Sequence, residues 1–429
     1  MIPRRAVVSW VVYDLANTIF SMGVVSLYFP ELVKLSVGAE SADATLSIVQ
    51  SISYGIIFLL SPLLGAMTDR AGRRMPFLVW STAISVTATA LIARGPFVSA
   101  AALFIVANAT YQAGLQFYDA LLVNVTTPEN RGRIGGIGVG VGYIGSFVAI
   151  ALGRAFGPDD FPTLFLSLAL AFLLFALPCF LFVREPRDRP RRQVFGWRVI
   201  RESTAETIRT LRSGREYPGL LRFLVGRVFY TDAINTVIGF MALYALNVAA
   251  AAGLEPDAAS FAKDMIMLGA ISCAVPAGFV WGRIADRIGP KRTLDAVLYL
   301  WMGTFVLAAA VGAFELSLGW LALVACLAGV GLAGTWSADR PYMLRLAPPH
   351  RIGEFYGLYG MVGRFSAITG PALWGLTTYL LVQQSGLPVL MGEAAAIVVL
   401  LAMIVIGYVI LRPVSDAPRH WGGDPLRQP

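Results

Sequence analysis

Residues 65–74 read GAMTDRAGRR, and much later the chain returns to GRIADRIGPKR at residues 282–292. Each copy lies between two long apolar runs. In each copy a glycine is followed one helical turn later by Asp-Arg, then by a second glycine and further basic residues. A motif that recurs at a fixed offset indicates a duplicated chain, and a duplication determines the architecture of the whole fold.

Two further landmarks repeat in the same order. Asp-x-x-Asn-Thr begins at Asp14 and again at Asp232, and Pro-x-x-Arg ends at Arg131 and again at Arg351, so all three landmarks recur at nearly the same offset. Six apolar runs separate the copies, and an even number keeps the two repeats parallel. Parallel repeats predict a binding site between two six-helix bundles at mid-membrane, opened alternately to each side.

The composition is that of a membrane protein. Of 429 residues, 57% are apolar and 14% are charged, against about 45–50% and about 25% in soluble proteins. One membrane-spanning helix needs about 20 mostly apolar residues. Long unbroken apolar runs exclude a soluble enzyme, and they exclude a membrane β-barrel, whose strands alternate in hydrophobicity. The twelve predicted spans lie at 7–34, 46–67, 76–94, 98–125, 133–156, 161–183, 220–250, 262–284, 292–313, 317–346, 352–382 and 389–411.

The positions of Lys and Arg predict the orientation of these spans. The side that holds both termini carries 27 of the 34 basic residues, and the opposite side carries four. Basic residues concentrate in cytoplasmic connections, so we expect both termini in the cytoplasm and the chain in the plasma (inner) membrane. The same asymmetry explains the net charge of +8 without a nucleic-acid partner.

The spans and connections predict four parts. These are an N-terminal six-helix bundle at 1–183, a cytoplasmic linker at 184–219, a C-terminal six-helix bundle at 220–411 and a cytoplasmic tail at 412–429. Within the linker, residues 194–211 intersperse apolar side chains with Arg and Glu. This pattern fits either an amphipathic helix on the membrane surface or a solvated tether between the halves.

The paired loops resemble the signature loop of the major facilitator superfamily, and further stretches are similar to the vacuole effluxer-like family within it. The resemblance covers nearly the whole chain. It implies an all-α membrane protein of the major facilitator fold, in which spans one, four, seven and ten line a central cavity. The chain departs from the family where Asp339-Arg340 replaces the usual Ser-Arg pair. The matching stretches are YDLAN at 13–17, FYDALL at 117–122, GVGYIG at 140–145, GEFYGLY at 353–359 and GRFS at 363–366.

Polar residues inside the spans are the candidates for substrate binding. An ionisable group in mid-span costs roughly 2.5–3.5 kcal/mol, so such groups usually face a partner or a wet cavity. One Asp falls in each cavity-lining span, with Asp14 expected in the cytoplasmic third and Asp119 in the extracellular third. The alternative is that these charges only pair helices with one another. The predicted substrate-binding residues are Asp14, Asn17, Tyr118, Asp119, Asp232, Asn235, Trp336, Asp339 and Arg340.

The chemistry of these side chains suggests their roles. Arg340 is a fixed cation whose planar fork suits a carboxylate or phosphate. Asn17 and Asn235 follow their aspartates by about one helical turn, so they share a face with them. Trp336 can stack on an apolar or cationic part of a solute. A carboxylate in an apolar setting can bind a proton as the cavity changes sides.

We expect the signature loops to gate the cavity. Gly65 and Gly282 allow another helix to approach closely. Asp69 and Asp286 are placed to meet the positive N-terminal end of a helix, which the resemblance identifies as spans eleven and five. The alternative is that the basic residues only orient the chain. The predicted gating residues are Gly65, Asp69, Arg70, Arg73, Arg74, Gly282, Asp286, Arg287, Arg292, Glu354 and Arg364.

Other motifs point away from catalysis. GVGYIG at 140–145 matches the dinucleotide fingerprint, but no strand precedes it and it lies inside an apolar run, so we interpret it as close helix packing. The sequence has no phosphate-binding loop of the Gly-x-x-x-x-Gly-Lys type. Its three cysteines and two histidines lack metal-ligand spacing. We therefore expect no cofactor, no metal and no enzymatic activity.

The sequence thus predicts a secondary transporter, monomeric in the bilayer, that moves a small polar or zwitterionic solute by alternating access. The resemblance suggests amino acids, and the in-span aspartates suggest coupling to protons. A lipid or amphiphile carrier is the alternative within transport. It predicts a cavity open sideways to the bilayer and little loss on neutralising Asp339 or Arg340. A membrane sensor or embedded enzyme is the alternative from another class.

Overall fold

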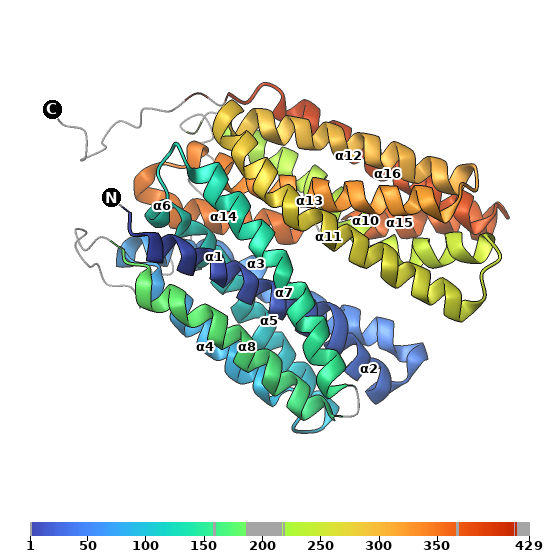
Figure 1. Ribbon diagram of the computed structural model, residues 1–429, viewed down its shortest axis with the longest axis horizontal. Coiled ribbons are helices and arrows are strands. Elements are labelled where there is room, and N and C mark those ends of the chain that lie inside the picture. Colours follow the sequence, from blue (N-terminus) through green and yellow to red (C-terminus); the bar gives the residue numbers. More distant parts are fainter. Residues whose placement is uncertain are drawn as a thin grey trace. The chain divides into compact units, whose positions relative to one another are not determined.

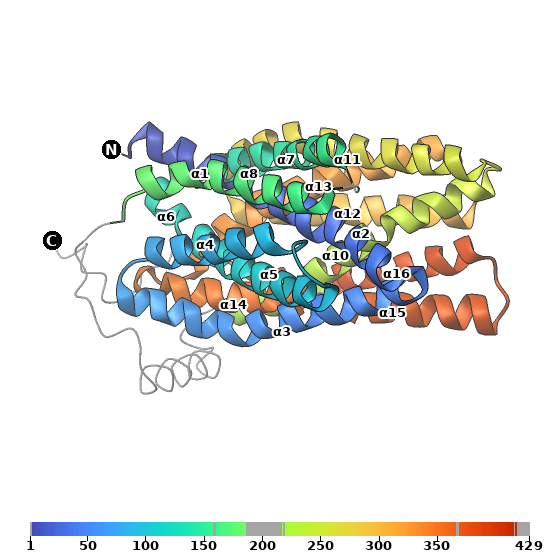
Figure 2. The same cartoon turned by 90° about the horizontal axis from the view of Figure 1, so that it is seen from below.

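A computed structural model of the chain describes residues 2–157, 160–185, 217, 219–365, 369–415 and 417 (Figure 1). The surface helix predicted within 194–211 and most of the predicted tail lie outside these residues. Every regular element within them is a helix. In Figures 1 and 2 the long helices of each half lie side by side and run along a common direction.

The first half contains six apolar helical stretches, several of them interrupted. Span one continues from α1 through a π-helical segment into α2, and span four continues from α5 into the short α6. The elements are α1 (Arg4–Thr18), the π-helix η1 (Ile19–Tyr28), α2 (Phe29–Val37), α3 (Ala39–Ala71), α4 (Met75–Leu91), α5 (Phe97–Ala120), α6 (Leu122–Val125), α7 (Arg131–Phe156) and α8 (Phe161–Phe182).

The second half also contains six apolar helical stretches. Span eleven of the chain is the most interrupted of them, because α14, α15 and a second π-helical segment follow one another along it. The elements are α10 (Leu220–Ala251), α11 (Pro256–Ile288), α12 (Pro290–Ala313), α13 (Leu318–Leu346), the 3-10 turn η3 (Pro349–Arg351), α14 (Ile352–Phe365), α15 (Thr369–Thr378), the π-helix η4 (Tyr379–Gln384) and α16 (Val389–Leu411).

These helices correspond to the twelve predicted apolar spans. Eleven helical stretches of the described chain are long and apolar enough to cross a membrane, and the twelfth, α4, is a shorter apolar helix. At 1.5 Å per residue, the 17 residues of α4 extend about 26 Å, close to the ~30 Å hydrocarbon thickness of a bilayer. Every backbone group in lipid needs an internal partner, so helices are the form that these runs must take.

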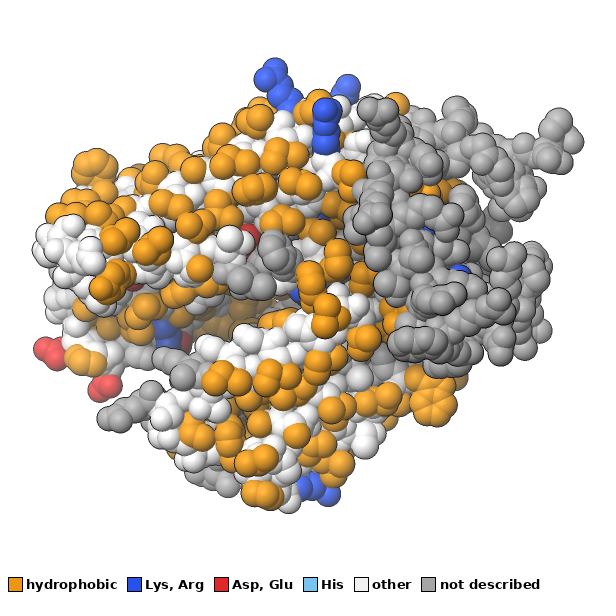
Figure 3. All heavy atoms as spheres, turned by 180° about the vertical axis from the view of Figure 1, so that it is seen from behind, with side chains coloured by type: hydrophobic (Ala, Val, Ile, Leu, Met, Phe, Trp, Pro, Cys, Tyr) orange, Lys and Arg blue, Asp and Glu red, His pale blue; other side chains and the backbone are white. Residues whose placement is uncertain are grey.

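The side chains at the outer surface suit a lipid environment. Figure 3, which views the molecule from behind Figure 1, shows hydrophobic side chains over much of the described surface and few charged side chains. Large apolar residues are widely exposed, among them Leu59 at 75%, Val98 at 79% and Phe314 at 75%. An exposed apolar surface of this extent marks contact with a membrane or another apolar partner.

The chain forms two compact units. Of the described residues, unit 1 contains 2–157, 160–185 and 343–361, and unit 2 contains 217, 219–342, 362–365, 369–415 and 417. The predicted division at 184–219 remains a prediction. The start of α14 groups with unit 1, and the contact responsible is described below.

Glycines explain how α1 packs on α7 within unit 1. A Cβ atom on Gly145 would overlap the carbonyl oxygen of Leu15, and one on Gly138 would lie 2.9 Å from the ring of Trp10. Both glycines are buried in a continuous helix. The GVGYIG segment is therefore a helix-packing surface, and the interpretation made from the sequence is confirmed.

Candidate functional site

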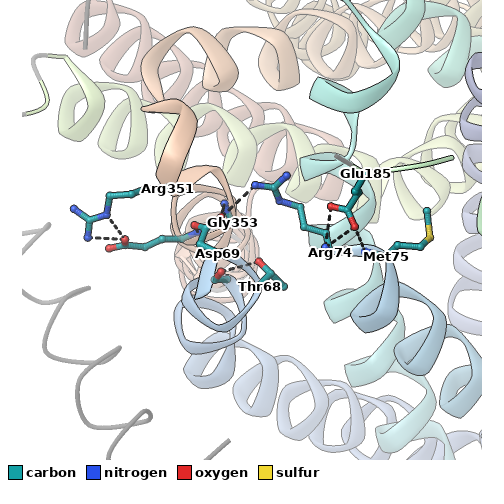
Figure 4. Close-up of polar contacts among 9 residues, drawn as sticks. Thr68, Asp69, Arg74, Met75, Glu185, Arg351 and Gly353 are labelled. Carbon is teal, nitrogen blue, oxygen red and sulfur yellow. Dashed lines mark hydrogen bonds and ion pairs between the residues drawn. The ribbon is translucent and has the colours of Figure 1, made fainter. Parts of the chain in front are cut away.

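The best-defined polar cluster of unit 1 joins the end of α3 to the start of α14 (Figure 4). Asp69 Oδ1 accepts a hydrogen bond from the backbone N–H of Gly353 at 2.9 Å, and Asp69 Oδ2 accepts one from Glu354 at 2.8 Å. The first N–H groups of a helix have no partner within the helix, and the helix dipole favours an anion there. Asp69 therefore lies at the N-terminal end of span eleven, as expected from the motif.

Two glycines allow this contact to form. A Cβ atom on Gly65 would overlap the carbonyl oxygen of Gly353, and a Cβ atom on Gly353 would lie 2.5 Å from the carbonyl oxygen of Gly65. One turn further along α14, a Cβ atom on Gly357 would lie 2.7 Å from the carbonyl oxygen of Ser61. The backbones of α3 and α14 therefore touch directly, and a larger residue at any of these glycines would force them apart.

The cluster extends to the start of α4. Arg74 Nη2 lies 3.2 Å from Asp69 Oδ1. The carboxylate of Glu185 accepts hydrogen bonds from the backbone N–H groups of Arg74 at 2.8 Å and Met75 at 2.7 Å. Arg351, the last residue of η3, binds Glu354 Oε2 of α14 through its guanidinium at 2.6 Å. Figure 4 shows Asp69, Arg74, Glu185 and Gly353 close together, an arrangement that suits a gate. The gating role itself stays a prediction.

Glu185 was missed from the sequence. It follows span six in an Arg-Glu-Pro segment and occupies the N-terminal end of α4, whose own N-cap residue provides no side-chain cap. The available signal was an isolated acidic residue at the start of a strongly basic connection. Its partner Met75 lies 110 residues earlier in the chain, and no local pattern identifies such a distant contact.

The second copy of the loop makes a different contact. Lys291 occupies the position that Arg74 has in the first copy. Its ammonium group binds the carboxylate of Asp295, one turn further along α12. Gly282 is buried and Asp286 half-buried, whereas Arg287 and Arg292 are exposed. The two loops share a sequence motif, but their basic residues bind differently placed carboxylates.

Tyr118 belongs to an aromatic stack inside unit 1. Its ring centroid lies 4.6 Å from that of Trp10 and 4.9 Å from that of Tyr13. The Tyr118 hydroxyl donates to the carbonyl of Trp10 at 3.1 Å, and Trp10 Nε1 donates to the carbonyl of Tyr118 at 3.2 Å. The fully buried Tyr118 side chain thus fastens α5 to α1. Its substrate-binding role stays a prediction.

The expected depth of Asp119 was wrong. Tyr118 stacks on Trp10, which lies about one helical turn before Asp14. Asp119, the next residue on α5, is therefore at the same end of unit 1 as Asp14. The reason is the direction of the chain, because the fourth span runs back toward the side on which the first begins. Both carboxylates are buried, at 5% exposure each.

Asn17 is the polar side chain of unit 1 that most clearly lacks a protein partner. Its side chain is 4% exposed, yet neither Oδ1 nor Nδ2 has a hydrogen bond within the described structure. Leaving a buried polar group unsatisfied costs about 1–3 kcal/mol. The π-helical segment of span one begins at Ile19, just beyond Asn17, and π-helical turns often occur at functional sites. The geometry marks Asn17 as a group that can bind a ligand.

In unit 2, Asp339 is neutralised by a partner from α10. Arg227 Nε lies 2.8 Å from Asp339 Oδ2, and the Tyr230 hydroxyl donates to Asp339 Oδ1 at 2.7 Å. The side chains of Arg227 and Asp339 are 3% and 0% exposed. The Asp339 carboxylate is therefore held in an ion pair that joins α10 and α13. Arg227 lies inside the seventh predicted span, and the sequence analysis did not name it as a site residue.

Asp232, on α10, binds the start of α15, another helix of span eleven. Its Oδ2 atom accepts a hydrogen bond from the backbone N–H of Gly370, in the first turn of α15, at 2.9 Å. A Cβ atom on Gly370 would lie 2.7 Å from Asp232 Oδ1. Asp232 is fully buried, and Arg340 and Arg364 are each 8% exposed. Asn235 and Trp336 are half-buried.

Glu393 is a second acidic residue that the sequence analysis missed. It is 3% exposed in the first turns of α16. Its Oε1 atom accepts a hydrogen bond from Asn247 Nδ2 at 2.8 Å, and its Oε2 atom has no hydrogen bond within the described structure. Its position near a span end resembled that of a solvated flanking charge. Among the described residues, no group of three His, Cys, Asp or Glu side chains is placed to hold a metal.

The sequence model of the Major Facilitator Superfamily matches residues 15–371 and again residues 233–428. The two matches begin directly after Asp14 and Asp232, which are the first residues of the repeated Asp-x-x-Asn-Thr motif. The chain therefore belongs to the Major Facilitator Superfamily. Its family and its transporter relatives identify it as an integral membrane transporter of the secondary type rather than an enzyme.

Curated relatives agree with this assignment. The chain is 26% identical over 431 residues to the uncharacterized MFS-type transporter YxiO of Bacillus subtilis (strain 168), a match covering 95% of this chain and 94% of that protein. It is 27% identical over 272 residues to autophagy-related protein 22-2 of Aspergillus clavatus, covering 57% of this chain and 43% of that protein. The second match supports the likeness to the vacuole effluxer-like family.

Solved structures confirm the predicted fold. The chain is similar to the human organic anion transporter MFSD10 (TETRAN), with a TM-score of 0.70 and 16% identity over 95% of this chain and 99% of that one. It is also similar to a bacterial homologue of the iron transporter ferroportin, with a TM-score of 0.70 and 14% identity over 95% of this chain and 98% of that one. The all-α membrane fold of twelve helices is therefore established.

Proposed function

We propose that this transporter moves a small polar or zwitterionic solute by alternating access, coupled to protons, with amino acids as the first substrates to test. The observation that carries the substrate class is the buried amide of Asn17. An amide offers both donors and an acceptor, so it can bind either a carboxylate or an ammonium group. Within unit 2, considered by itself, Arg340 is a buried guanidinium of the kind that suits a carboxylate.

The gating part of the proposal is supported by the cluster at Asp69. Its carboxylate holds the start of α14 through two backbone N–H groups. Such a contact can form and break as a unit, because the helix end and the ion pair with Arg74 share one carboxylate. Charge-assisted hydrogen bonds of this kind are individually stronger than neutral ones.

The proton-coupling part is supported by buried carboxylates. Asp14 and Asp119 at one end of unit 1, and Glu393 in unit 2, are each at most 5% exposed. Ionisable groups in the membrane interior commonly mark ion or proton pathways. Transport driven by an imposed pH gradient in reconstituted vesicles is the expected behaviour. Failure of both a pH gradient and a membrane potential to drive accumulation of an identified substrate would reject coupling.

The decisive experiment is a thermal-shift screen of amino acids and other small zwitterions on purified protein, repeated with Asn17→Ala. A bound solute stabilises the folded protein by mass action. A substrate should raise the Tm of the unmutated protein and at least half of that shift should disappear in the variant. Thr377→Ala is the control, because it removes a hydroxyl bonded within its own helix. An equal shift in Asn17→Ala would contradict the assignment of the site.

One observation favours the amphiphile-carrier alternative. Unit 1 contains a large apolar groove between α3, α4 and α5, bordered by exposed side chains such as Trp80 at 71%. A carrier of amphiphiles would transfer fluorescent phospholipid between the leaflets of a vesicle. Transport of small zwitterions without lipid transfer would reject this alternative.

A further inference from the structure

The groove of unit 1 is long, apolar and close to one end of the bundle. Its volume is about 1140 Å³, above the roughly 300–1,000 Å³ of ordinary small-molecule sites. The lining on α3 extends from Ile56 to Ala71. At 1.5 Å per residue this is about 22 Å, more than half of the ~30 Å hydrocarbon core. The principal wall residues are Ile56, Leu60, Leu64, Trp80, Ile84 and Phe117.

The wall offers almost no polar group to a ligand. The lining includes the hydroxyls of Ser81 and Thr110, and each donates to a carbonyl of its own helix, Leu78 and Val106 respectively. No acidic residue is part of the described lining. The interior of the groove therefore suits a hydrocarbon chain and provides no partner for a positively charged group.

Arg73 is the exception, and it lies at one end of the groove. It belongs to the short connection between α3 and α4. Its guanidinium has no hydrogen bond or ion pair among the described residues, whereas the neighbouring Arg74 binds Asp69. This connection lies on the side to which the positive-inside pattern assigns the cytoplasm. Arg73, which no described carboxylate neutralises, therefore lies at the level of the lipid headgroups at one end of the apolar groove.

We propose that this groove binds an anionic glycerophospholipid of the cytoplasmic leaflet, with an acyl chain along the wall of α3, α4 and α5 and the phosphate on Arg73. Basic groups at the cytoplasmic surface attract anionic lipids, and basic pockets between spans bind anionic headgroups. The planar fork of arginine matches phosphate oxygens. The absence of acidic residues from the described lining disfavours a headgroup that carries an ammonium group.

The physics of the bilayer predicts which part of the site selects the lipid. A chain that enters the groove from the membrane leaves one apolar environment for another, so its burial provides little net driving force. Selectivity between headgroups must therefore come from Arg73. The shape of the groove decides whether an acyl chain fits. A substitution that removes the charge of Arg73 and a substitution that fills the groove therefore test two separate parts of the site.

The experiment measures thermal unfolding of the purified full-length protein in nanodiscs of phosphatidylcholine with or without phosphatidylglycerol. Phosphatidylglycerol should raise the Tm of the unmutated protein. Arg73→Gln should lose at least half of this shift. Arg222→Gln is the matched control, because Arg222 is an exposed arginine at the start of α10 on the same predicted side; it should keep the full shift. A full shift in Arg73→Gln, or no shift in the unmutated protein, would overturn the proposal.

A second arm tests the groove itself. Ala109→Phe narrows the groove and keeps Arg73. It should also abolish the Tm shift from phosphatidylglycerol. If Ala109→Phe fails to fold, Trp80→Ala is the second variant. It removes an exposed part of the wall and should weaken the Tm shift from phosphatidylglycerol. Glycerol phosphate without acyl chains should have no effect. If glycerol phosphate raised the Tm as much as phosphatidylglycerol, the site would bind only a headgroup. If the protein transferred the lipid between leaflets, the lipid would be a substrate. Either result would overturn the proposal of a resident lipid.

Discussion

At the scale of single residues, three carboxylates of this transporter occupy two kinds of setting. Asp69 and Asp232 each accept hydrogen bonds from N–H groups in the first turn of a helix. Asp339 instead has a buried arginine and a tyrosine hydroxyl as its partners. We propose that the contact of Asp69 with its helix end is released during transport, whereas the ion pair of Asp339 holds two helices of one unit together. Substitutions should therefore have different consequences in the two settings.

Asp69→Asn should weaken the contact between α3 and α14 while preserving its shape. The substitution removes the charge that interacts with the helix end and with Arg74, and it replaces one acceptor oxygen with a donor. We expect a loss of about 1–2 kcal/mol in unfolding free energy and a larger proportional loss of transport. Thermal unfolding and vesicle flux measure the two effects. Asp257→Asn, at an exposed carboxylate in the first turn of α11, should cost less stability, because solvent screens its interaction with the helix dipole, and it should leave transport unchanged.

Asp339→Asn should destabilise the protein strongly, because it removes the charge of one partner from the buried ion pair with Arg227. Breaking a buried ion pair on one side typically costs about 3–5 kcal/mol. The double variant Arg227→Met with Asp339→Leu should recover at least half of the lost stability, since both charges are removed together. A double-mutant cycle of unfolding free energies tests this. Recovered stability without recovered transport would assign Asp339 a role in transport as well.

At the scale of elements, the close approach of α3 and α14 depends on glycine. Gly65→Ala should separate the two helices, because the added methyl group would overlap the backbone of Gly353. We expect a lower Tm and faster labelling of a cysteine that replaces Thr68, a buried side chain of α3 beside Gly353. Gly55→Ala is the matched control on the same helix, since its Cβ atom meets nothing within 4 Å. That change should leave labelling unaltered and slightly stabilise α3.

The sequence predicted the helices well and the contacts between them less completely. Apolar runs long enough to cross a bilayer carry their own signal. The helix dipole predicted Asp69 at a helix N-terminus, and the family resemblance identified that helix as span eleven. The partners of Arg227 and Glu185 lie 112 and 110 residues away, and neither hydropathy nor periodicity encodes such distances. The π-helical segments of spans one and eleven were also invisible, because their composition is that of ordinary apolar helix.

At the scale of the whole molecule, the distribution of basic residues makes a direct prediction about orientation. Ser385→Cys, in the connection before α16, should react with a membrane-impermeant maleimide added outside intact cells. Ser415→Cys, after α16, should react only in permeabilised cells. Both serines are exposed. The native cysteines lie in the spans and provide the background to be measured. Labelling in the opposite pattern would invert the predicted topology.

One position of the duplicated segments accounts for the different direction in which their basic residues bind. Where the later segment has Asp295, the earlier one has Leu78 at the same offset, so Arg74 has no carboxylate one turn ahead and pairs backward with Asp69. Lys291 pairs forward with Asp295 instead. A hydrocarbon or an acid one turn into the following helix therefore decides whether the preceding cation is tied within its own helix, and Asp295→Leu would untie Lys291 from α12.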